Sequence, residues 1–264
     1  MARTYKTLFL IVAILALPIS QTFAAPINYG DFSDIPPGSV MYLDVTESSA
    51  TDPLPLFGPP SITGNNLAFL PKSFAAFATS GANDITDGQL NTQVMVLEIN
   101  NVVAGGLTSL SVTERGDYTL FGTGTTLTNV AAGVSLHVEI LEVDGNPIVP
   151  INVSSNASFS NSLTSSGPTV LAPWAISSGV SLGSVLAQNQ IPFKFGVTKA
   201  NIVIDNQLLA TSEANSIAFI AKKGFSIRPV IEINPDFVIP EPTTLILGLA
   251  SLLAVTTIRR QAFA

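Results

Sequence analysis

Asp84 and Asp87 are the strongest candidates for metal-binding residues in the sequence. They stand three residues apart in the segment 81–88, whose glycines favour a loop. Carboxylates that converge in a loop can bind a hard cation such as Ca²⁺, with backbone carbonyls completing a shell of about six to eight oxygens. The segment lacks the acidic ladder and the closing Glu of an EF-hand. We therefore expect either a structural calcium ion or a turn in which the aspartates accept Asx-type hydrogen bonds.

A serine nucleophile is suggested by one motif and disfavoured by the order of the residues around it. Ser181 lies in Gly-Val-Ser-Leu-Gly, which matches the G-x-S-x-G elbow of α/β-hydrolases. That elbow needs a later histidine, whereas the chain's single histidine, His137, precedes it. A His-Asp-Ser order through Asp144 lacks the Gly-Asp-Ser-Gly context. His137 and Glu139 fall on one face of a predicted strand, either for acid–base or metal chemistry or as solvated surface residues.

Sugar recognition is the remaining chemistry that the residue types allow. Stacking aromatics are central to it, and Trp174, the only tryptophan, follows a proline in an irregular stretch. We expect Trp174 either to contact a ligand or to belong to the core. Glycoside hydrolysis needs two carboxylates roughly 5–9.5 Å apart, and the spacing of the 18 acidic residues singles out no such pair.

Charge and cysteine content exclude several classes of function. Residues 25–242 hold seven basic and all 18 acidic residues, a formal charge of −11. No basic cluster could neutralise a phosphate backbone, so nucleic-acid binding is excluded. The chain has no cysteine, which excludes thiol nucleophiles, thiolate metal sites and disulfide stabilisation.

The elements that must position these residues are predominantly strands. Apolar and polar residues alternate in 134–140, in 193–198 and in 225–233, which is typical of half-buried antiparallel strands. We expect an all-β fold, an antiparallel β-sandwich of jelly-roll type with about ten to thirteen short strands. One domain, residues 25–234, should contain it.

Turns and the few helices complete this prediction. The predicted turns are Asp144-Gly145, Arg115-Gly116-Asp117 and Asp205-Asn206. The Ser- and Asn-rich segment 154–166 predicts a long surface loop, and helices are predicted at 185–190 and 213–221. Pro229 should mark either an edge strand or a break between two short strands.

The C-terminal segment carries an ordered set of signals. Pro240, Glu241 and Pro242 end the tether 235–242, and an uncharged apolar stretch precedes Arg259 and Arg260. Counted from Thr243, the stretch of 16 residues spans about 24 Å as a helix, close to what a bilayer requires. Residues 243–264 therefore predict a transmembrane helix with an Arg-containing cytoplasmic tail.

This order resembles the PEP-CTERM sorting signal of exported bacterial proteins, over about a tenth of the chain. The resemblance implies that an exosortase recognises Pro240-Glu241-Pro242 and removes the helix. It also implies transfer to the cell surface or the extracellular polysaccharide. The alternative is an ordinary single-span anchor that stays in the inner membrane.

The N-terminus has the layout of a secretory signal peptide. Arg3 and Lys6 precede the apolar run 8–17, and small residues lead to a cleavage site between Ala24 and Ala25. We expect residues 1–24 to engage the secretion translocon and signal peptidase.

Together these features predict an exported protein, single-pass in the inner membrane before processing and then at the cell surface or extracellular. Its role should be non-catalytic: structural, adhesive or polysaccharide-associated. The alternatives are a secreted carbohydrate-active hydrolase with a carboxylate pair, and a permanently anchored envelope protein.

Overall fold

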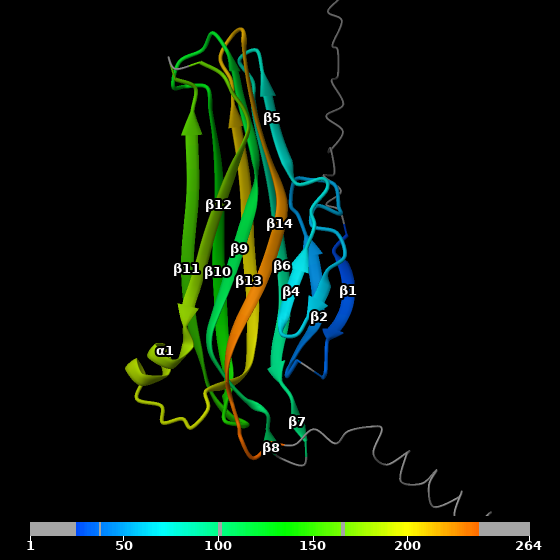
Figure 1. Ribbon diagram of the computed structural model, residues 1–264, viewed down its shortest axis with the longest axis vertical. Helices are drawn as coiled ribbons and strands as arrows, with labels where there is room; N and C mark the ends of the chain where they lie inside the picture. The colour runs from blue at the N-terminus through cyan, green and yellow to red at the C-terminus, as the bar shows by residue number, and fades with distance from the viewer. Residues whose placement is uncertain (1–24, 37, 100–101, 165–166, 238–264) are drawn as a thin grey trace, which may run out of the picture.

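A computed structural model describes residues 25–36, 38–99, 102–164 and 167–237 (Figure 1). The expected all-β class is confirmed, because within these ranges the chain forms fourteen strands and a single helix. The elements are β1 (Ile27–Ser33), β2 (Val40–Ser48), β3 (Ser61–Thr63), β4 (Asn66–Phe69), β5 (Ala75–Thr79), β6 (Asn83–Val96), β7 (Glu98–Ile99), β8 (Val102–Val103), β9 (Gly105–Gly122), β10 (Asn129–Val143), β11 (Asn146–Ser162), β12 (Thr169–Ser181), α1 (Leu182–Gln188), β13 (Val197–Thr211) and β14 (Ser216–Ile233).

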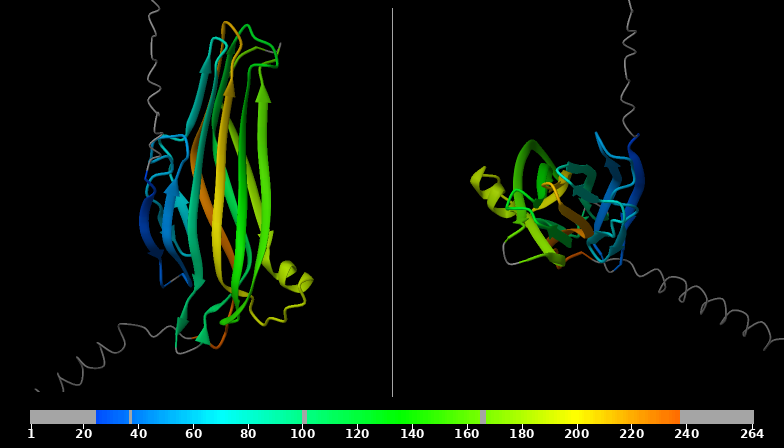
Figure 2. Two further views of the ribbon diagram at one scale, coloured as in Figure 1. Left: turned by 180° about the vertical axis from the view of Figure 1, so that it is seen from behind. Right: turned by 90° about the horizontal axis from the view of Figure 1, so that it is seen from above.

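The long strands form two antiparallel layers (Figures 1 and 2). The first, called the front sheet, has the strand order β1-β2-β6-β13-β10-β11. The second, called the back sheet, has the order β12-β9-β14, and β4 and β5 pair along the other side of β14. A single pairing between Val197 and Leu107 joins the two sheets at one end. The layers therefore form a sandwich-like, nearly closed structure.

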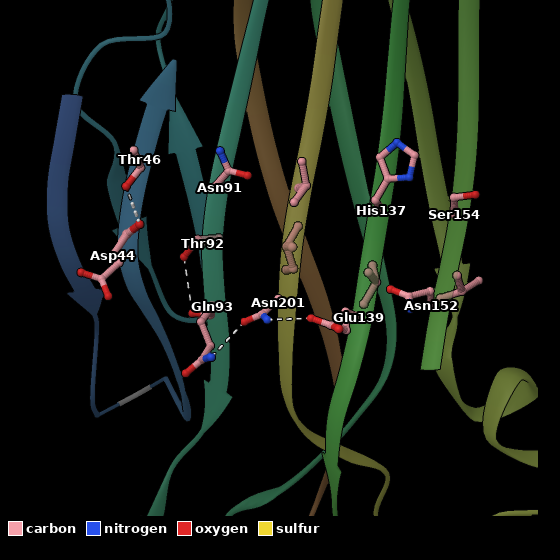
Figure 3. A pocket seen from close by; sticks show the side chains of 14 residues that line it. Asp44, Thr46, Asn91, Thr92, Gln93, His137, Glu139, Asn152, Ser154 and Asn201 are labelled. Atoms are coloured by element: carbon pink, nitrogen blue, oxygen red, sulfur yellow. Dashed lines mark hydrogen bonds between the residues drawn. The ribbon is translucent and has the colours of Figure 1, made fainter. Parts of the chain in front are cut away.

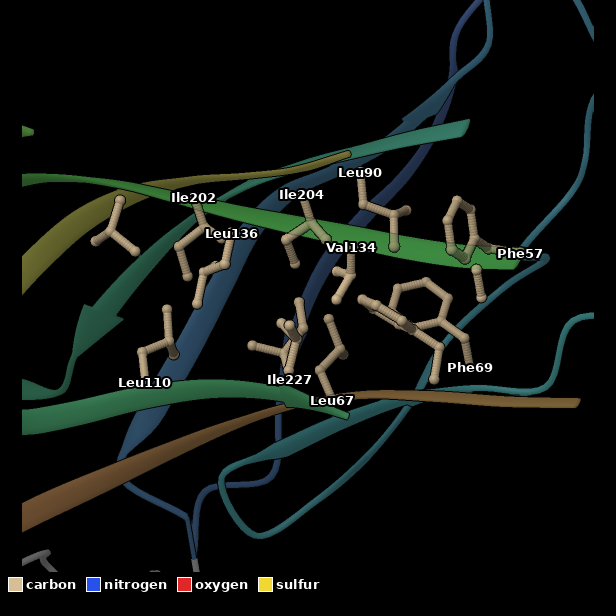
Figure 4. Packing of buried hydrophobic residues seen from close by; sticks show 14 of the residues in the cluster. Phe57, Leu67, Phe69, Leu90, Leu110, Val134, Leu136, Ile202, Ile204 and Ile227 are labelled. Atoms are coloured by element: carbon tan, nitrogen blue, oxygen red, sulfur yellow. The ribbon is translucent and has the colours of Figure 1, made fainter. Parts of the chain in front are cut away.

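Apolar residues of alternating parity fill the space between the sheets (Figure 4). Leu136 on β10 and Ile204 on β13 point inward from the front sheet, and Leu110 and Ile227 meet them from the back sheet. Each of these side chains is at most 1% exposed. Burial of such a side chain stabilises the fold by about 1.5–3 kcal/mol, so the alternation predicted from the sequence fixes which face of each strand is solvated.

Two of the three predicted turns are wrong. Asp144-Gly145 does form the two-residue hairpin turn between β10 and β11, with both residues at positive φ (49° and 77°). Asp205-Asn206, by contrast, lies within β13, and Arg115-Gly116-Asp117 lies within β9. Gly116 is needed there for close packing, since a Cβ atom would come within 1.8 Å of the Ala221 carbonyl oxygen.

The loop predicted at 154–166 is also wrong over most of its length. The segment continues β11, which pairs with β10 as far as Ser162. Ser154, Asn156, Ser158 and Ser160 face solvent, while Val153, Ala157 and Phe159 alternate with them and pack against the core. Ser155 and Asn161 have the inward parity and bond to Ser178 and Tyr118. Polar composition therefore concealed a strand in which, from Ile151 onward, the apolar residues share one parity.

The helix predictions had mixed outcomes. The helix predicted at 185–190 corresponds to α1, which Ser181 caps at its N-terminus. The helix predicted at 213–221 is wrong, because β14 begins at Ser216 and pairs with β9 throughout. Pro229 lies where β14 has only β9 as a neighbour in the described chain, so its missing N–H faces an unpaired edge.

The signal peptide, Ala24, the sorting motif Pro240-Glu241-Pro242 and the pair Arg259-Arg260 lie outside the described residues. In the ranges that are described, no helix has both the length and the apolar character needed to cross a bilayer. Strands extend from Ile27 to Ile233, inside the expected 25–234.

Candidate functional site

The outer face of the front sheet is hollowed into a polar groove (Figure 3). Five neighbouring strands line it, namely β2, β6, β13, β10 and β11, and its volume is about 790 Å³. A second hollow of about 620 Å³ continues along the same strands. We call the two together the front groove. Most of its outward side chains are the polar partners of the inward apolar ones, and the apolar Val203 lies among them. The alternation of the strands places these outward side chains side by side.

One row of the groove consists of side chains that bond across three strands. Gln93 Nε2 donates to Asn201 Oδ1 at 2.9 Å, and Asn201 Nδ2 donates to Glu139 Oε2 at 2.9 Å (Figure 3). Backbone pairing places Asn201 opposite both neighbours, so the row follows from the register of β6, β13 and β10. Gln93 uses one donor within the row, Asn201 uses one donor and one acceptor, and both amides keep other polar capacity for a ligand.

A second row lies further along the strands around Asp205. Gln89 Nε2 donates to Asp205 Oδ1 at 2.6 Å, and Asn91 Nδ2 donates to Gln89 Oε1 at 3.0 Å. His137 Nε2 lies 3.5 Å from the other Asp205 oxygen, with both side chains about half exposed. A pair this exposed contributes about 0–1 kcal/mol to stability, and both side chains remain open to solvent in the groove.

The chemistry of the groove suits a hydroxyl-rich and uncharged ligand. Amides, hydroxyls and carboxylates supply donors and acceptors at short intervals. Among the described lining residues there is no Lys or Arg, whereas Asp44, Asp87, Glu139 and Asp205 are acidic. A polyanion would therefore meet repulsion along the whole groove.

Asp84 and Asp87 are not brought together. Both lie on β6, a strand and not the expected loop, and an odd spacing of three places them on opposite faces. Asp84 accepts a hydrogen bond from the Phe77 N–H at 2.7 Å, and the Asp87 N–H donates to Asp52 at 2.9 Å. No group of three or more His, Asp or Glu side chains in the described ranges is arranged to hold a metal ion. The calcium site stays a prediction.

Trp174 is a core residue and not an exposed ligand contact. Its side chain is 3% exposed, its ring stacks on Phe159 with centroids 5.9 Å apart, and Nε1 donates to the Ala221 carbonyl at 3.2 Å. The ring lies within the sandwich because position 174 has inward parity on β12. It therefore cannot stack on a sugar from the outside.

The other residues predicted from the sequence have different positions and roles in the structure. His137 and Glu139 share the outer face of β10, as predicted, and both line the groove. Ser181 ends β12, where its hydroxyl accepts from the Ser184 N–H at 3.4 Å and lies 2.8 Å from the Ser184 hydroxyl. Ser181 thus has a capping role. Ala25 is the first described residue and is exposed.

Sequence reasoning missed most of the groove residues. Gln89, Gln93 and Asn201 alternate with apolar residues at a parity that could have been read. Their side-by-side position could not be predicted, because it depends on which strands pair, and strand pairing is set by contacts between residues far apart in the sequence.

Comparisons with known proteins add no assignment. No protein-family model matches the chain, and no curated protein matches it. Among solved structures, the enzymatically active domain of tailspike protein 4 from bacteriophage CBA120 is 12% identical, with a TM-score of 0.17, over 73% of this chain and 19% of that one. A double-cysteine mutant of ENZbleach xylanase is 9% identical (TM-score 0.21; 83% and 93%), and lectin I-B4 from Griffonia simplicifolia is 11% identical (0.18; 78% and 100%). The chain spans about a fifth of the tailspike chain, and likenesses at these TM-scores support no conclusion about function.

Proposed function

We propose that this is an exported protein of the cell surface or extracellular matrix whose front groove binds an uncharged polysaccharide. Its role is structural or adhesive and non-catalytic. The observation that carries this proposal is the row Gln93–Asn201–Glu139, in which polar side chains from three strands lie side by side in an open groove. A linear, hydroxyl-rich polymer fits such a surface, because it can meet successive rows along its length.

The hydrolase alternative has weaker geometric support. Glu139 and Asp205 are the groove carboxylates that take part in the hydrogen-bonded rows. Asp205 lies opposite Ser135, four residues from Glu139 on the same strand, which separates the two acids by about 13 Å along the strands. Glycosidases need roughly 5–9.5 Å between their carboxylates, so Glu139 and Asp205 are too far apart to serve as the pair. Asp87 and Asp205 are diagonal neighbours on β6 and β13, about 7–8 Å apart, and are the pair that the hydrolase alternative would use.

The proposed location rests on the terminal signals in the sequence. The signal peptide 1–24 directs export, and the segment with Pro240, Glu241 and Pro242 directs sorting by an exosortase. We also propose the finer jelly-roll class for the sandwich. It is supported by the alternation of consecutive long strands between the sheets, from β9 at the back to β10 in front and from β13 in front to β14 at the back.

Binding is tested with the full-length protein on an array of neutral and anionic glycans. We expect binding to neutral polymers and a loss of roughly two- to tenfold in affinity for Asn201→Ala, since one net hydrogen bond contributes about 0.5–1.5 kcal/mol. Ser111→Ala, on the outer face of the back sheet, is the matched control and should bind normally. Equal binding by both variants, or a preference for anionic glycans, would refute the groove as the site.

Sorting is tested separately by mass spectrometry of the protein released from the cell surface. We expect no peptide from 243–264. A surface protein that retains this segment would instead establish the permanently anchored alternative.

A further inference from the structure

Three polar side chains meet in the interior of the sandwich, away from the groove. Lys222 extends from β14, Glu114 from β9 and Asn206 from β13, and they are 2%, 0% and 3% exposed. Lys222 Nζ lies 2.9 Å from Glu114 Oε1 and donates a hydrogen bond to Asn206 Oδ1. The cluster therefore connects the front sheet, through Asn206, to the back sheet, through the other two residues.

Aromatic rings surround the amine. Nζ lies 4.3 Å from the ring centroid of Phe74, 5.1 Å from that of Phe57 and 5.5 Å from that of Phe225. The rings exclude water from the reactive atoms. Burial lowers the pKa of the Lys222 ammonium and raises the pKa of the Glu114 carboxyl, against their mutual attraction. Both shifts favour the state in which the carboxyl holds the proton and the amine is neutral.

The cluster is poorly satisfied as a simple ion pair. Glu114 Oε2 and Asn206 Nδ2 are buried and have no hydrogen-bond partner among the described residues. Buried polar groups are normally paired, because an unpaired group loses about 1–3 kcal/mol. The cluster therefore leaves a carboxylate oxygen and an amide nitrogen unpaired beside a buried amine. A reaction among these three groups would explain why this arrangement is present.

We propose that Lys222 and Asn206 become joined by an intramolecular amide bond, with Glu114 as the catalytic residue. The Lys222 Nζ lone pair attacks the side-chain carbonyl carbon of Asn206, and the Nζ–Cγ bond forms. Glu114 takes a proton from Nζ and delivers one to Nδ2, the Cγ–Nδ2 bond breaks, and ammonia leaves. Glu114 ends as it began, and the reaction needs no oxidant, reductant or cofactor.

The fold supplies what this reaction otherwise lacks. A primary amide is a poor electrophile, but two groups held in contact react with a large entropic advantage over free ones. A neutral amine is the nucleophilic form, and a dry site preserves it. The pair Lys199–Glu142 provides a contrast, because its charged atoms are 3.5 Å apart and its side chains are about a quarter exposed.

The test is a double digest of the denatured full-length protein with trypsin and a glutamate-specific protease. Positions 206 and 222 fall on either side of Glu213, so cleavage there separates fragment 200–213 from the fragment that begins at 214. We expect the two to remain joined, with Lys222 uncleaved by trypsin and a mass lower by one ammonia. Recovery of the separate peptides from folded wild-type protein would overturn the proposal.

Three variants identify the chemistry. Glu114→Gln should yield separate peptides, because the proton carrier is lost. Asn206→Asp should give a joined species of the same mass as wild type, since water leaves in place of ammonia and the new amide nitrogen comes from Lys222. Lys223→Arg, the matched control at the exposed neighbouring position, should keep the bond. Persistence of the joined peptides in Lys222→Met would show that another residue forms the link and would also overturn the assignment.

Discussion

Replacing Lys222 with Met should destabilise the protein far more than replacing a surface lysine. Methionine fills similar space among the rings but leaves the Glu114 carboxyl without its partner 2.9 Å away. The variant also lacks the proposed link to Asn206, and loss of one partner from a buried pair of titratable groups costs about 3–5 kcal/mol. In a domain of this size each kcal/mol lowers Tm by about 2–4 °C, so the variant should melt about 6–20 °C below wild type.

The matched control is Lys199→Met. Lys199 Nζ lies 3.5 Å from Glu142, and both side chains are about a quarter exposed, so the expected loss is about 0–1 kcal/mol. Urea unfolding of the full-length protein at pH 7.5 measures both variants. Equal losses of unfolding free energy in the two variants would refute the reasoning, because they would show that burial of Lys222 and Glu114 does not increase their contribution to stability.

The pH dependence gives an independent check on the same variant. Burial raises the pKa of Glu114 above its unfolded value of 4.5. The folded state therefore binds more protons than the unfolded state between those two pKa values, and stability falls as the pH rises through that window. The loss in free energy of unfolding caused by Lys222→Met should therefore become smaller between pH 7.5 and pH 5, by at most about 1.4 kcal/mol per pH unit. The double variant Lys222→Met/Glu114→Gln should lose this dependence, and a deficit that grows at pH 5 would contradict the sign.

Three further outcomes follow from other contacts. Glu47→Gln should lower the free energy of unfolding, measured in urea, by about 1–3 kcal/mol. The reason is that the buried carboxylate accepts hydrogen bonds from several backbone N–H groups of the loop after β2. A loss below about 0.5 kcal/mol, on the order of one weak hydrogen bond, would contradict this. Hydrogen bonding from the Thr125 N–H lowers the pKa of Glu213, so its contribution to stability is present above pH 4.5 and is lost as the pH falls. Glu213→Gln should therefore flatten the acid limb of the stability profile, and an unchanged limb would argue against it. A chelator should leave Tm unchanged, because Asp84 and Asp87 face opposite ways, and a measurable fall would establish a calcium site.

The sequence was sufficient to predict the class of fold and the faces of its strands. The alternation in 134–140 correctly placed Leu136 inward and His137 outward, because the burial of one face is a local periodic constraint. The pairing of β13 with both β6 and β10 could not be predicted, since register depends on contacts between residues more than fifty positions apart for β10 and more than a hundred for β6.

The errors coincide with the residues of greatest interest. Asp205-Asn206 was predicted as a turn, because Asp and Asn favour turns, yet Asp205 belongs to the groove and Asn206 to the buried cluster. Arg115-Gly116-Asp117 was predicted as a turn beside Glu114 for the same reason. When residues that disfavour strands lie within a strand, a packing or functional requirement has overridden their intrinsic preference for turns.

The alternation of β13 has a consequence for affinity. Asp205 faces the groove and its neighbour Asn206 faces the interior, so one peptide unit joins the two sites. A bond from Asn206 to Lys222 would restrain β13, the strand that carries Asp205 and Asn201. A ligand would then find the groove preorganised and would lose less conformational entropy on binding. The covalent link in the core would in this way slow the release of the ligand from the groove.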